Sequence, residues 1–517
     1  MTDAVPPSVH DHYSESMRMA WILGAFAFLL QMATNGRYGY FRDELYYLAC
    51  SDHLAFGYVD LAPLIAWLAR GSRMILGDSI HAIRLLPALA FGAEVTLTGF
   101  LTRELGGRKW AIFLACVCVL LAPTILGNGT RLAMNPLEPL FWMGCLYVLL
   151  AALNRQQPAL LLYCGVLLGF GLLNKHSTVF FLAALVVGLA LTPERRVFAS
   201  KWFWAAAAIA FLIALPNVIW QYAHHFPTLE DLQNVKATHK NIELPPVAFL
   251  KQQIMMLNPI TDLVWIAGLA YLFLHRNAKR FRFVGFSYLA FLAVMMALKG
   301  KDYYLAPIYP MLFAAGGVFW ETLTANRPRF RWIRVALPAV VIAVCLVSVP
   351  LALPILPPDK IVPYMHALGL GVTRTETSMT GLLPQHFADE FGWEEMVAEV
   401  AKVYNALPTE ERAKTAILAG NYGGAGAIDF FGARYGLPKS ISPHQNYYFW
   451  GPRDYTGERV ILLESKMKDA QYWCGTVEKG PRVAPYYGMG WEHYDILVCH
   501  NLKVPLSEAW PKLKIWD

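Results

Sequence analysis

The sequence predicts a mainly α-helical protein that crosses a membrane many times and carries a small α/β domain in its last third. Only 16% of the 517 residues are charged, whereas soluble domains usually contain about a quarter. The mean hydropathy is +0.37. Apolar runs long enough to cross a bilayer, roughly 20 residues each, recur over residues 17–353, and this pattern ends near residue 354. Lipid is therefore the expected solvent of the larger part of the chain.

Eleven apolar segments are predicted to form the membrane-spanning helices. They lie at about 17–35, 83–102, 110–126, 136–153, 159–173, 178–191, 202–220, 259–275, 283–298, 303–321 and 333–353. The segments 159–173 and 178–191 are short and are separated by the polar residues NKHS, so one bent element is the alternative there. Residues 1–16 are polar and lack the features of a cleavable signal peptide, so we expect a cytoplasmic tail there.

Loops rich in lysine and arginine alternate along the chain with loops that contain few of these residues. One set of loops is basic with almost no acids: 103–109, 154–158, 192–201, 275–282 and 326–334. The other set contains acids, aromatic residues, proline and histidine: 36–82, 127–135, 174–177, 221–258 and 299–302. Basic loops remain on the cytoplasmic side. The prediction is a multi-pass protein of the plasma (inner) membrane with a cytoplasmic N-terminus and an extracytoplasmic, periplasmic C-terminal domain.

Residues 354–517 are predicted to form this outer domain. A proline-rich linker, PILPPDKIVP, is followed by a helical pattern at 389–407, a buried strand at 415–421 and a helix at 424–436 that ends in glycine. Further strands are expected at 458–464 and 494–501. Cys474 and Cys499 both fall in this domain, in a compartment where disulfides form, but their spacing alone leaves the pairing open.

Several classes of protein are excluded by what the sequence lacks. The basic residues are not gathered into tracts, so no nucleic-acid partner is expected. No phosphate-binding loop or dinucleotide fingerprint precedes a helix, and no CxxC or HExxH metal pattern is found. No cofactor is predicted, and the sequence leaves a divalent-cation requirement open.

The segment FRDELYY at positions 41–47 is the richest candidate for chemistry. It holds an acid pair, Asp43 and Glu44, at the predicted start of an interfacial amphipathic helix, and a second such helix is expected after Asp60. Ionisable groups at the membrane surface of a span are costly and often functional, and a carboxylate there can act as general base on a hydroxyl. The alternative is that Asp43 caps the helix. The neighbouring candidates for substrate binding are Arg42, Tyr46, Tyr47 and Asp60.

Two other groups of polar residues are expected at the same membrane face. KGKDYY contains Lys299, Lys301, Tyr303 and Tyr304, which suit a phosphate or, alternatively, a pair of snorkelling lysines beside an aromatic belt. GNGTRLAMNPLEPLFW and LLNKHS add further candidates, namely Arg131, Asn135, Glu138, Lys175 and His176. Loop 221–246 is predicted to be a substrate lid. Cations and acids on one face suit a membrane-borne, phosphate-linked substrate whose leaving phosphate must be stabilised.

Four stretches together resemble one known family. They are GYFRDELYYLACSDHLAFGYVDLAPLIAWLA, GNGTRLAMNPLEPLFW, LGFGLLNKHS and LKGKDYYLAPIYPMLFAAGG. The chain resembles the bacterial branch of the dolichyl-phosphate-mannose–protein mannosyltransferases, which form glycosyltransferase family 39 in the GT-C superfamily. The resemblance covers about residues 20–320, and the outer tail looks like that of one bacterial subgroup.

The resemblance implies a GT-C transmembrane catalytic domain at 17–353 and inverting transfer of a sugar from a polyprenyl-phosphate donor on the extracytoplasmic face. It implies that Asp43 is the catalytic base and that Glu44 shapes the site. Lys299, Lys301 and Tyr304 would lie near the donor phosphate, with Lys175 close to the donor. Many relatives carry an acid where this chain has Asn135, which leaves Glu138 as a substitute. The acceptor, a hydroxyl of an envelope glycolipid, lipopolysaccharide or protein, does not carry over, and neither does the sugar.

Two other functions compete with the transferase. A transporter or flippase of a lipid-linked sugar also places charges in the membrane, but transporters often have repeated halves and no repeat is evident here. A non-catalytic envelope scaffold that binds a partner through the outer domain leaves the acidic first loop unexplained.

Overall fold

The computed structural model describes residues 9–374 and 376–517, with side chains from residue 15 onward. It divides into two compact units. The transmembrane unit comprises the chain up to Asn35, Arg84–Val218 and Glu243–Ile355. The outer unit comprises Gly36–Ile83, Ile219–Ile242 and Leu356–Asp517. Residues 1–8 of the predicted tail 1–16 lie outside the described residues, and the first helix already begins at Val9.

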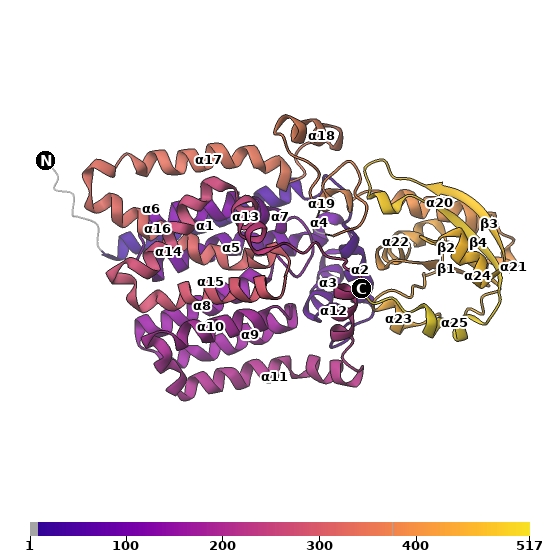
Figure 1. Cartoon of the computed structure of the whole chain (residues 1–517), viewed down its shortest axis with the longest axis horizontal. Coiled ribbons are helices and arrows are strands. Elements are labelled where there is room, and N and C mark those ends of the chain that lie inside the picture. Colours follow the sequence, from indigo (N-terminus) through magenta and orange to yellow (C-terminus); the bar gives the residue numbers. More distant parts are fainter. Residues whose placement is uncertain (1–8, 375) are drawn as a thin grey trace. The chain divides into compact units, whose positions relative to one another are not determined.

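Helices of the transmembrane unit run side by side (Figure 1). They are α1 (Val9–Thr34), α5 (Leu85–Glu104), α6 (Lys109–Leu121), α7 (Pro123–Asn128), α8 (Glu138–Arg155), α9 (Leu161–Asn174), α10 (Thr178–Ala190), most of α11 (Lys201–Ala223), α13 (Pro246–Leu257), α14 (Asp262–Leu274), α15 (Arg282–Ala297), α16 (Tyr309–Asn326) and α17 (Ile333–Ala352). Among the closest neighbours, α14 packs on α16. A Cβ at Gly268 or Gly316 would collide with the backbone of the opposite helix, as expected where small residues bring membrane helices together.

Every predicted apolar segment contains a helix, and the segments 159–173 and 178–191 are two helices as predicted, not the one bent element that was the alternative. Lys175 ends α9 with an extended backbone, φ −158° and ψ 131°, so α9 and α10 are separate elements. Among the described residues, five helices are long and apolar enough to cross a membrane, or up to seven if each of two bent pairs counts as one span. Eleven spans therefore stays a prediction, while the multi-pass helical character is confirmed.

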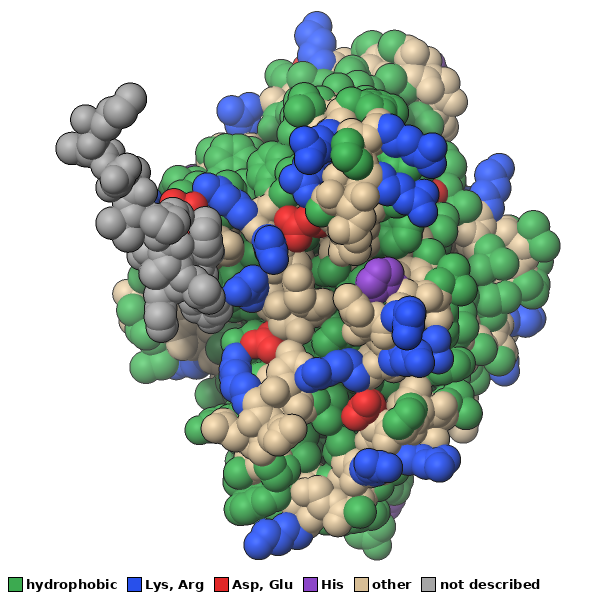
Figure 2. All heavy atoms as spheres, turned by 90° about the vertical axis from the view of Figure 1, so that its left-hand side faces the viewer, with side chains coloured by type: hydrophobic (Ala, Val, Ile, Leu, Met, Phe, Trp, Pro, Cys, Tyr) green, Lys and Arg blue, Asp and Glu red, His purple; other side chains and the backbone are tan. Residues whose placement is uncertain are grey.

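The basic loops of the transmembrane unit meet at one end of its bundle. Glu104, at the end of α5, pairs with Arg155 at 2.6 Å and accepts a hydrogen bond from Asn154. Asn154 in turn accepts from Arg280, and Glu321 accepts from the backbone N–H of Arg108 at 2.7 Å. Figure 2 shows Lys and Arg side chains distributed over this end, with few acids among them. Such a surface is typical of the cytoplasmic side of a membrane protein.

The outer unit is built around a four-stranded sheet in the order β1-β2-β4-β3. The strands are β1 (Thr415–Ala419), β2 (Arg459–Leu463), β3 (Cys474–Val483) and β4 (Tyr494–Leu502). β1 and β2 are parallel, whereas β4 is antiparallel to both of its neighbours. Three of these strands were predicted. β3 was missed because it is an edge strand whose side chains are mostly exposed, so it lacks an apolar run.

Helices complete the outer unit: α2 (Arg42–Asp52), α3 (Leu64–Leu76), α4 (Ile80–Ile83), α12 (Pro227–Ala237), α18 (Pro358–Ala367), α19 (Gln385–Ala388), α20 (Trp393–Ala406), α21 (Thr409–Arg412), α22 (Tyr422–Phe431), α23 (Tyr447–Trp450), α24 (Met467–Trp473) and α25 (Leu506–Leu513). A disulfide joins Cys474 to Cys499 between β3 and β4. It settles the pairing that their spacing left open.

The two helices predicted in the first outer segment are present, but they differ in burial. α2 buries nine of its eleven residues and packs against α22 of the same unit. α3 leaves an apolar end exposed, formed by Met74, Ile75 and Leu76. α3 therefore exposes an apolar surface, whereas α2 is an internal element of the outer unit, and an interfacial position stays a prediction for α3.

Candidate active site

Asp43 lies in the first turn of α2 and does not cap this helix. The capping role falls to Glu44, whose Oε2 accepts a hydrogen bond from the backbone N–H of Phe41 at 2.8 Å. Glu44 is fully buried. The Asp43 side chain retains 29% of its exposure, so it is the accessible member of the acid pair. The helix-cap alternative for Asp43 is therefore not what the geometry supports.

Two donors hold one oxygen of the Asp43 carboxylate. The hydroxyl of Tyr422, the first residue of α22, donates to Oδ1 at 2.8 Å. Arg42 Nε lies 3.4 Å from the same oxygen. Both of these contacts are at Oδ1 and not at Oδ2.

Arg42 is buried among acids and aromatic rings. Its Nη2 lies 3.7 Å from Glu376 Oε2, and its guanidinium lies over the rings of Tyr422 and Trp491 at 5.5 and 5.9 Å. The backbone N–H of Arg42 donates to the carbonyl of Asp389 at 3.0 Å. Burial raises the pKa of the Asp389 carboxyl to about 6, although Arg42 opposes the shift. Arg42 is thus fixed by the outer domain and forms one side of the Asp43 environment.

Asp60 and Tyr46 form a second pair close by. Tyr46, buried in α2, donates its hydroxyl to Asp60 Oδ1 at 2.8 Å, and its ring packs on that of Tyr422 with centroids 4.7 Å apart. Burial raises the pKa of Asp60 to about 7, with a further contribution from the nearby charge of Asp231. Tyr47 is buried beside Tyr46. Three of the predicted binding residues therefore form part of the framework of the outer unit.

Close packing of α2 on α22 brings Asp43 to Tyr422. A Cβ at Gly426 would lie 2.8 Å from the backbone of Leu45, and a Cβ at Gly423 would lie 2.5 Å from Arg42 Cγ. Glycine is the residue that permits such an approach. The sequence NYGGAG at the start of α22 thus has a packing role that was not recognised from the sequence.

The transmembrane unit holds a separate polar cluster around Lys175. Lys175 Nζ donates to Asn135 Oδ1 at 2.7 Å and to Glu138 Oε2 at 3.0 Å, and it lies 4.9 Å from the ring centre of Tyr304. Ser177 donates its hydroxyl to the other oxygen of Glu138. Burial lowers the pKa of Lys175, but the Glu138 carboxylate and the two nearby tyrosines outweigh this effect, so the pKa is raised and the amine is charged.

The remaining predicted residues of this unit lie on its loops and helix ends. Lys299 has a left-handed backbone, φ 53°, and an exposed side chain that pairs with Glu243 at 2.7 Å. Lys301 immediately precedes the 3₁₀ turn Asp302–Ile308, in which the rings of Tyr303 and Tyr304 pack edge to face. Arg131 follows α7 and donates to Thr130 and to the carbonyl of Gly127. His176 contacts Asn217 at 3.1 Å.

Loop 221–246 contains a helix, α12, and its role as a substrate lid stays a prediction. Asp231 on this helix accepts a hydrogen bond from Gln445 at 2.9 Å, and Lys514 pairs with Glu230 at 2.5 Å. Across the described residues, no group of three or more His, Cys, Asp or Glu side chains is arranged to hold a metal ion. The ordered contacts of α12 tie this segment to the C-terminal part of the outer unit.

Comparison with known proteins finds glycosyltransferases among the similar sequences. The sequence profile of the dolichyl-phosphate-mannose-protein mannosyltransferase family matches residues 60–220. The chain is 27% identical over 221 residues to the lipid A galacturonosyltransferase RgtD of Rhizobium johnstonii, covering 41% of this chain and 45% of that protein. It is 26% identical over 237 residues to the lipopolysaccharide core galacturonosyltransferase RgtB of the same organism, covering 44% and 48%. The chain spans less than half the length of these two relatives.

Solved structures show the same fold over nearly the whole chain. The crystal structure of ArnT from Cupriavidus metallidurans bound to undecaprenyl phosphate superposes with a TM-score of 0.61 and 13% identity, covering 92% of this chain and 97% of that one. The same protein in its apo state gives a TM-score of 0.58 at 14% identity, with the same coverage.

The fold and these relatives support a membrane-embedded glycosyltransferase of the GT-C type. Within this type, the chain is similar to glycosyltransferase family 39, the family that the sequence motifs resemble.

Proposed function

We propose that this protein transfers a sugar from a polyprenyl-phosphate donor to a hydroxyl of an envelope acceptor on the extracytoplasmic face of the membrane. The observation that carries the proposal is the Asp43 carboxylate. It is partly exposed, and Oδ1 is held by Tyr422 and Arg42, so Oδ2 is directed to a substrate. A fixed carboxylate within reach of a hydroxyl is what a general base requires.

The proposed reaction is a single displacement with inversion at the anomeric carbon. The acceptor hydroxyl attacks this carbon while Asp43 Oδ2 takes the hydroxyl proton. The bond between the anomeric carbon and the phosphate oxygen breaks, and the polyprenyl phosphate leaves with the electron pair. Glu44 contributes indirectly, because it caps the helix that carries Asp43.

Cations of the transmembrane unit are assigned to the donor phosphate. A lysine ammonium has three donors, and Lys175 uses two of them for Asn135 and Glu138, so one remains for a phosphate oxygen. Lys299, Lys301 and Tyr304 are assigned to the same phosphate, and Arg131, His176 and Tyr303 to the donor or acceptor around it. Support for a polyprenyl-phosphate donor comes from the structural neighbour, whose structure contains undecaprenyl phosphate.

The acceptor is proposed to be the lipid A or core region of lipopolysaccharide. Support comes from the two relatives, which are described as transferases acting on lipid A and on the lipopolysaccharide core. A glycolipid acceptor also suits a site at the membrane surface, because donor and acceptor are both anchored in the bilayer. Other envelope glycans and proteins are the alternatives that the experiment distinguishes.

Mass spectrometry of envelope lipids and proteins from a deletion strain and its parent tests this function. We expect one lipid A or core species to lose the mass of a single sugar in the deletion strain and to regain it on complementation. If a protein loses the sugar mass instead, the acceptor is a protein and not a lipid. Loss of the sugar together with lipid-linked sugar retained in the inner leaflet would instead show a flippase, and an unchanged set of glycans would contradict the proposed function.

A further inference from the structure

We propose that Tyr422, in the C-terminal part of the chain, is a positioning residue that orients the Asp43 carboxylate for catalysis. The proposal rests on the proposed function, in which Asp43 is the general base. It assigns the outer domain a direct part in the reaction, because Tyr422 lies 379 positions from Asp43 in the sequence and donates its hydroxyl to Oδ1 at 2.8 Å.

The hydroxyl of Tyr422 has a single direction available. The Tyr422 ring is buried and packs against the ring of Tyr46, with centroids 4.7 Å apart, and against the ring of His444, at 4.9 Å. The Arg42 guanidinium lies 5.5 Å from the same ring. A phenol packed in this way cannot swing away from Asp43 without displacing its neighbours, since side chains in close-packed interiors are held in place.

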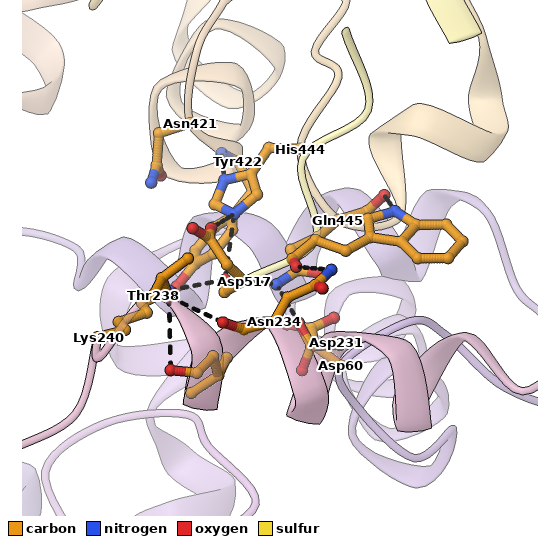
Figure 3. Close-up of polar contacts among 12 residues, drawn as sticks. Asp60, Asp231, Asn234, Thr238, Lys240, Asn421, Tyr422, His444, Gln445 and Asp517 are labelled. Atoms are coloured by element: carbon orange, nitrogen blue, oxygen red, sulfur yellow. Dashed lines mark hydrogen bonds and ion pairs between the residues drawn. The ribbon is translucent and has the colours of Figure 1, made fainter. Parts of the chain in front are cut away.

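The backbone of Tyr422 is fixed by His444. The Tyr422 N–H donates to His444 Nδ1 at 3.2 Å. Because a backbone N–H can only donate, Nδ1 is the acceptor, and in the neutral imidazole the proton is therefore on Nε2. Nε2 lies 3.4 Å from the carbonyl oxygen of Asp517 and 3.5 Å from its Oδ1. Figure 3 shows His444 between Tyr422 and Asp517.

The same segment is bound by α12 and the loop after it. Lys240 Nζ and Gln445 Nε2 donate to the Asp517 carbonyl at 2.7 and 2.9 Å, and Asn234 donates to the carbonyl of Trp516 at 2.8 Å. These contacts are drawn in Figure 3. A continuous series of hydrogen bonds therefore connects α12 through Asp517 and His444 to Tyr422, and from there to Asp43.

The Tyr422 hydroxyl orients the Asp43 carboxylate. Burial raises the pKa of Tyr422 well above its usual value, so the hydroxyl remains a donor throughout the physiological range. With Oδ1 occupied, the carboxylate plane is fixed and Oδ2 keeps one direction toward the acceptor hydroxyl. Small misplacements of a reacting group reduce rates strongly, by about 10²-fold for 1 Å.

The test is Tyr422→Phe in the purified full-length protein, assayed by sugar transfer in detergent. Phenylalanine keeps the ring packing and removes only the hydroxyl. We expect kcat to fall by about 10- to 100-fold, while KM for donor and acceptor stays within about twofold, because neither substrate binds to Tyr422 in this proposal. A mainly structural role would instead reduce the amount of folded protein and leave kcat per folded molecule unchanged.

Tyr447→Phe is the matched control. Tyr447 is another buried tyrosine of the outer unit, and its hydroxyl donates to a different carboxylate, Asp429 Oδ2, at 3.0 Å. We expect its kcat to match the wild type. The inference is overturned if Tyr422→Phe retains wild-type kcat, or if both variants lose kcat equally. Asp43→Asn separates the two proposals. If Asp43→Asn is active, Asp43 is not the general base and the proposed function fails. If Asp43→Asn is inactive while Tyr422→Phe is fully active, only the role of Tyr422 is wrong.

Discussion

At the residue scale, four carboxylates of the outer unit differ in their exposure and in their hydrogen-bond partners. Asp43 is partly exposed and held by two donors at one oxygen. Glu44 caps α2, Asp389 is buried beside Arg42, and Asp60 is paired with Tyr46. The sequence predicted Asp43 as the base, Glu44 as a residue that shapes the site and Asp60 as a substrate-binding residue. Of Asp43, Glu44 and Asp60, Asp43 is the acid that exposure and hydrogen bonding leave accessible, and it is the one that we propose for proton transfer.

Asp60 gives a pH-dependent prediction. Its pKa of about 7 in the folded protein exceeds the ordinary value of 3.8, so the folded state binds the proton more tightly. Its contribution to stability is complete below about pH 4 and is lost as the pH rises through about 7. Asp60→Asn keeps an acceptor for Tyr46 and cannot ionise. The unfolding temperature of Asp60→Asn relative to the wild type should therefore rise between pH 5 and pH 8, by the equivalent of at most about 3 kcal/mol.

Thermal unfolding of the detergent-solubilised proteins across this pH range measures the effect. Asp454→Asn serves as control, because Asp454 is an exposed acid of the same unit. The prediction is contradicted if the difference in unfolding temperature between Asp60→Asn and the wild type stays constant from pH 5 to pH 8.

At the element scale, local patterns predicted the transmembrane helices, four helices of the outer unit and three strands, but they missed helices such as α12, α18 and α25 and the contacts between distant elements. The helix at 424–436 was expected from its apolar spacing and glycine stop, and α22 with the following turn ends at Gly436 in the left-handed conformation, φ 72°. That α22 packs on α2 was not predictable, since no local periodicity encodes a partner about 380 residues away. For the same reason Tyr422, Glu376 and His444 were missed as neighbours of the Asp43 region.

Gly426 tests whether this packing controls the site. An added methyl in Gly426→Ala would meet the Leu45 backbone at 2.8 Å, so α2 must move away from α22. Overpacking of this kind costs about 1–3 kcal/mol, and the shift would separate Asp43 from Tyr422. We expect a lower unfolding temperature and a kcat reduced by about tenfold or more, measured by unfolding in detergent and by sugar transfer.

Gly371→Ala is the matched control for this substitution. An added Cβ at Gly371 meets nothing within 4 Å, so this variant should match the wild type in both measurements. If Gly426→Ala also matches the wild type, close packing of α2 on α22 does not set the geometry of the site.

At the scale of the whole molecule, charge and covalent structure give a consistent orientation. Basic loops meet at one end of the transmembrane unit (Figure 2), and the outer unit holds a disulfide between Cys474 and Cys499. Basic loops favour the cytoplasm, whereas disulfides persist in oxidising compartments. The proposed topology therefore places the outer unit, with Asp43, on the extracytoplasmic side.

Cysteine labelling tests this orientation. The free cysteines of the described residues are all buried, so an introduced surface cysteine can be followed selectively. In spheroplasts, a membrane-impermeant maleimide should label Lys468→Cys in the outer unit, whereas Arg196→Cys, in the loop between α10 and α11, should react only after permeabilisation. The reverse labelling pattern would contradict the proposed topology.

The most direct test of the central claim is sugar transfer by the purified full-length protein in detergent, comparing the wild type with Asp43→Asn. The donor is polyprenyl-phosphate sugar extracted from the host membranes, and the acceptor is lipid A and core lipopolysaccharide from a deletion strain. We predict that the wild type releases polyprenyl phosphate and adds one sugar mass to the acceptor. Asp43→Asn should be slower by about 10²–10⁴-fold, the usual contribution of a general base, with an unchanged unfolding temperature. Transfer by Asp43→Asn at the wild-type rate would contradict the account.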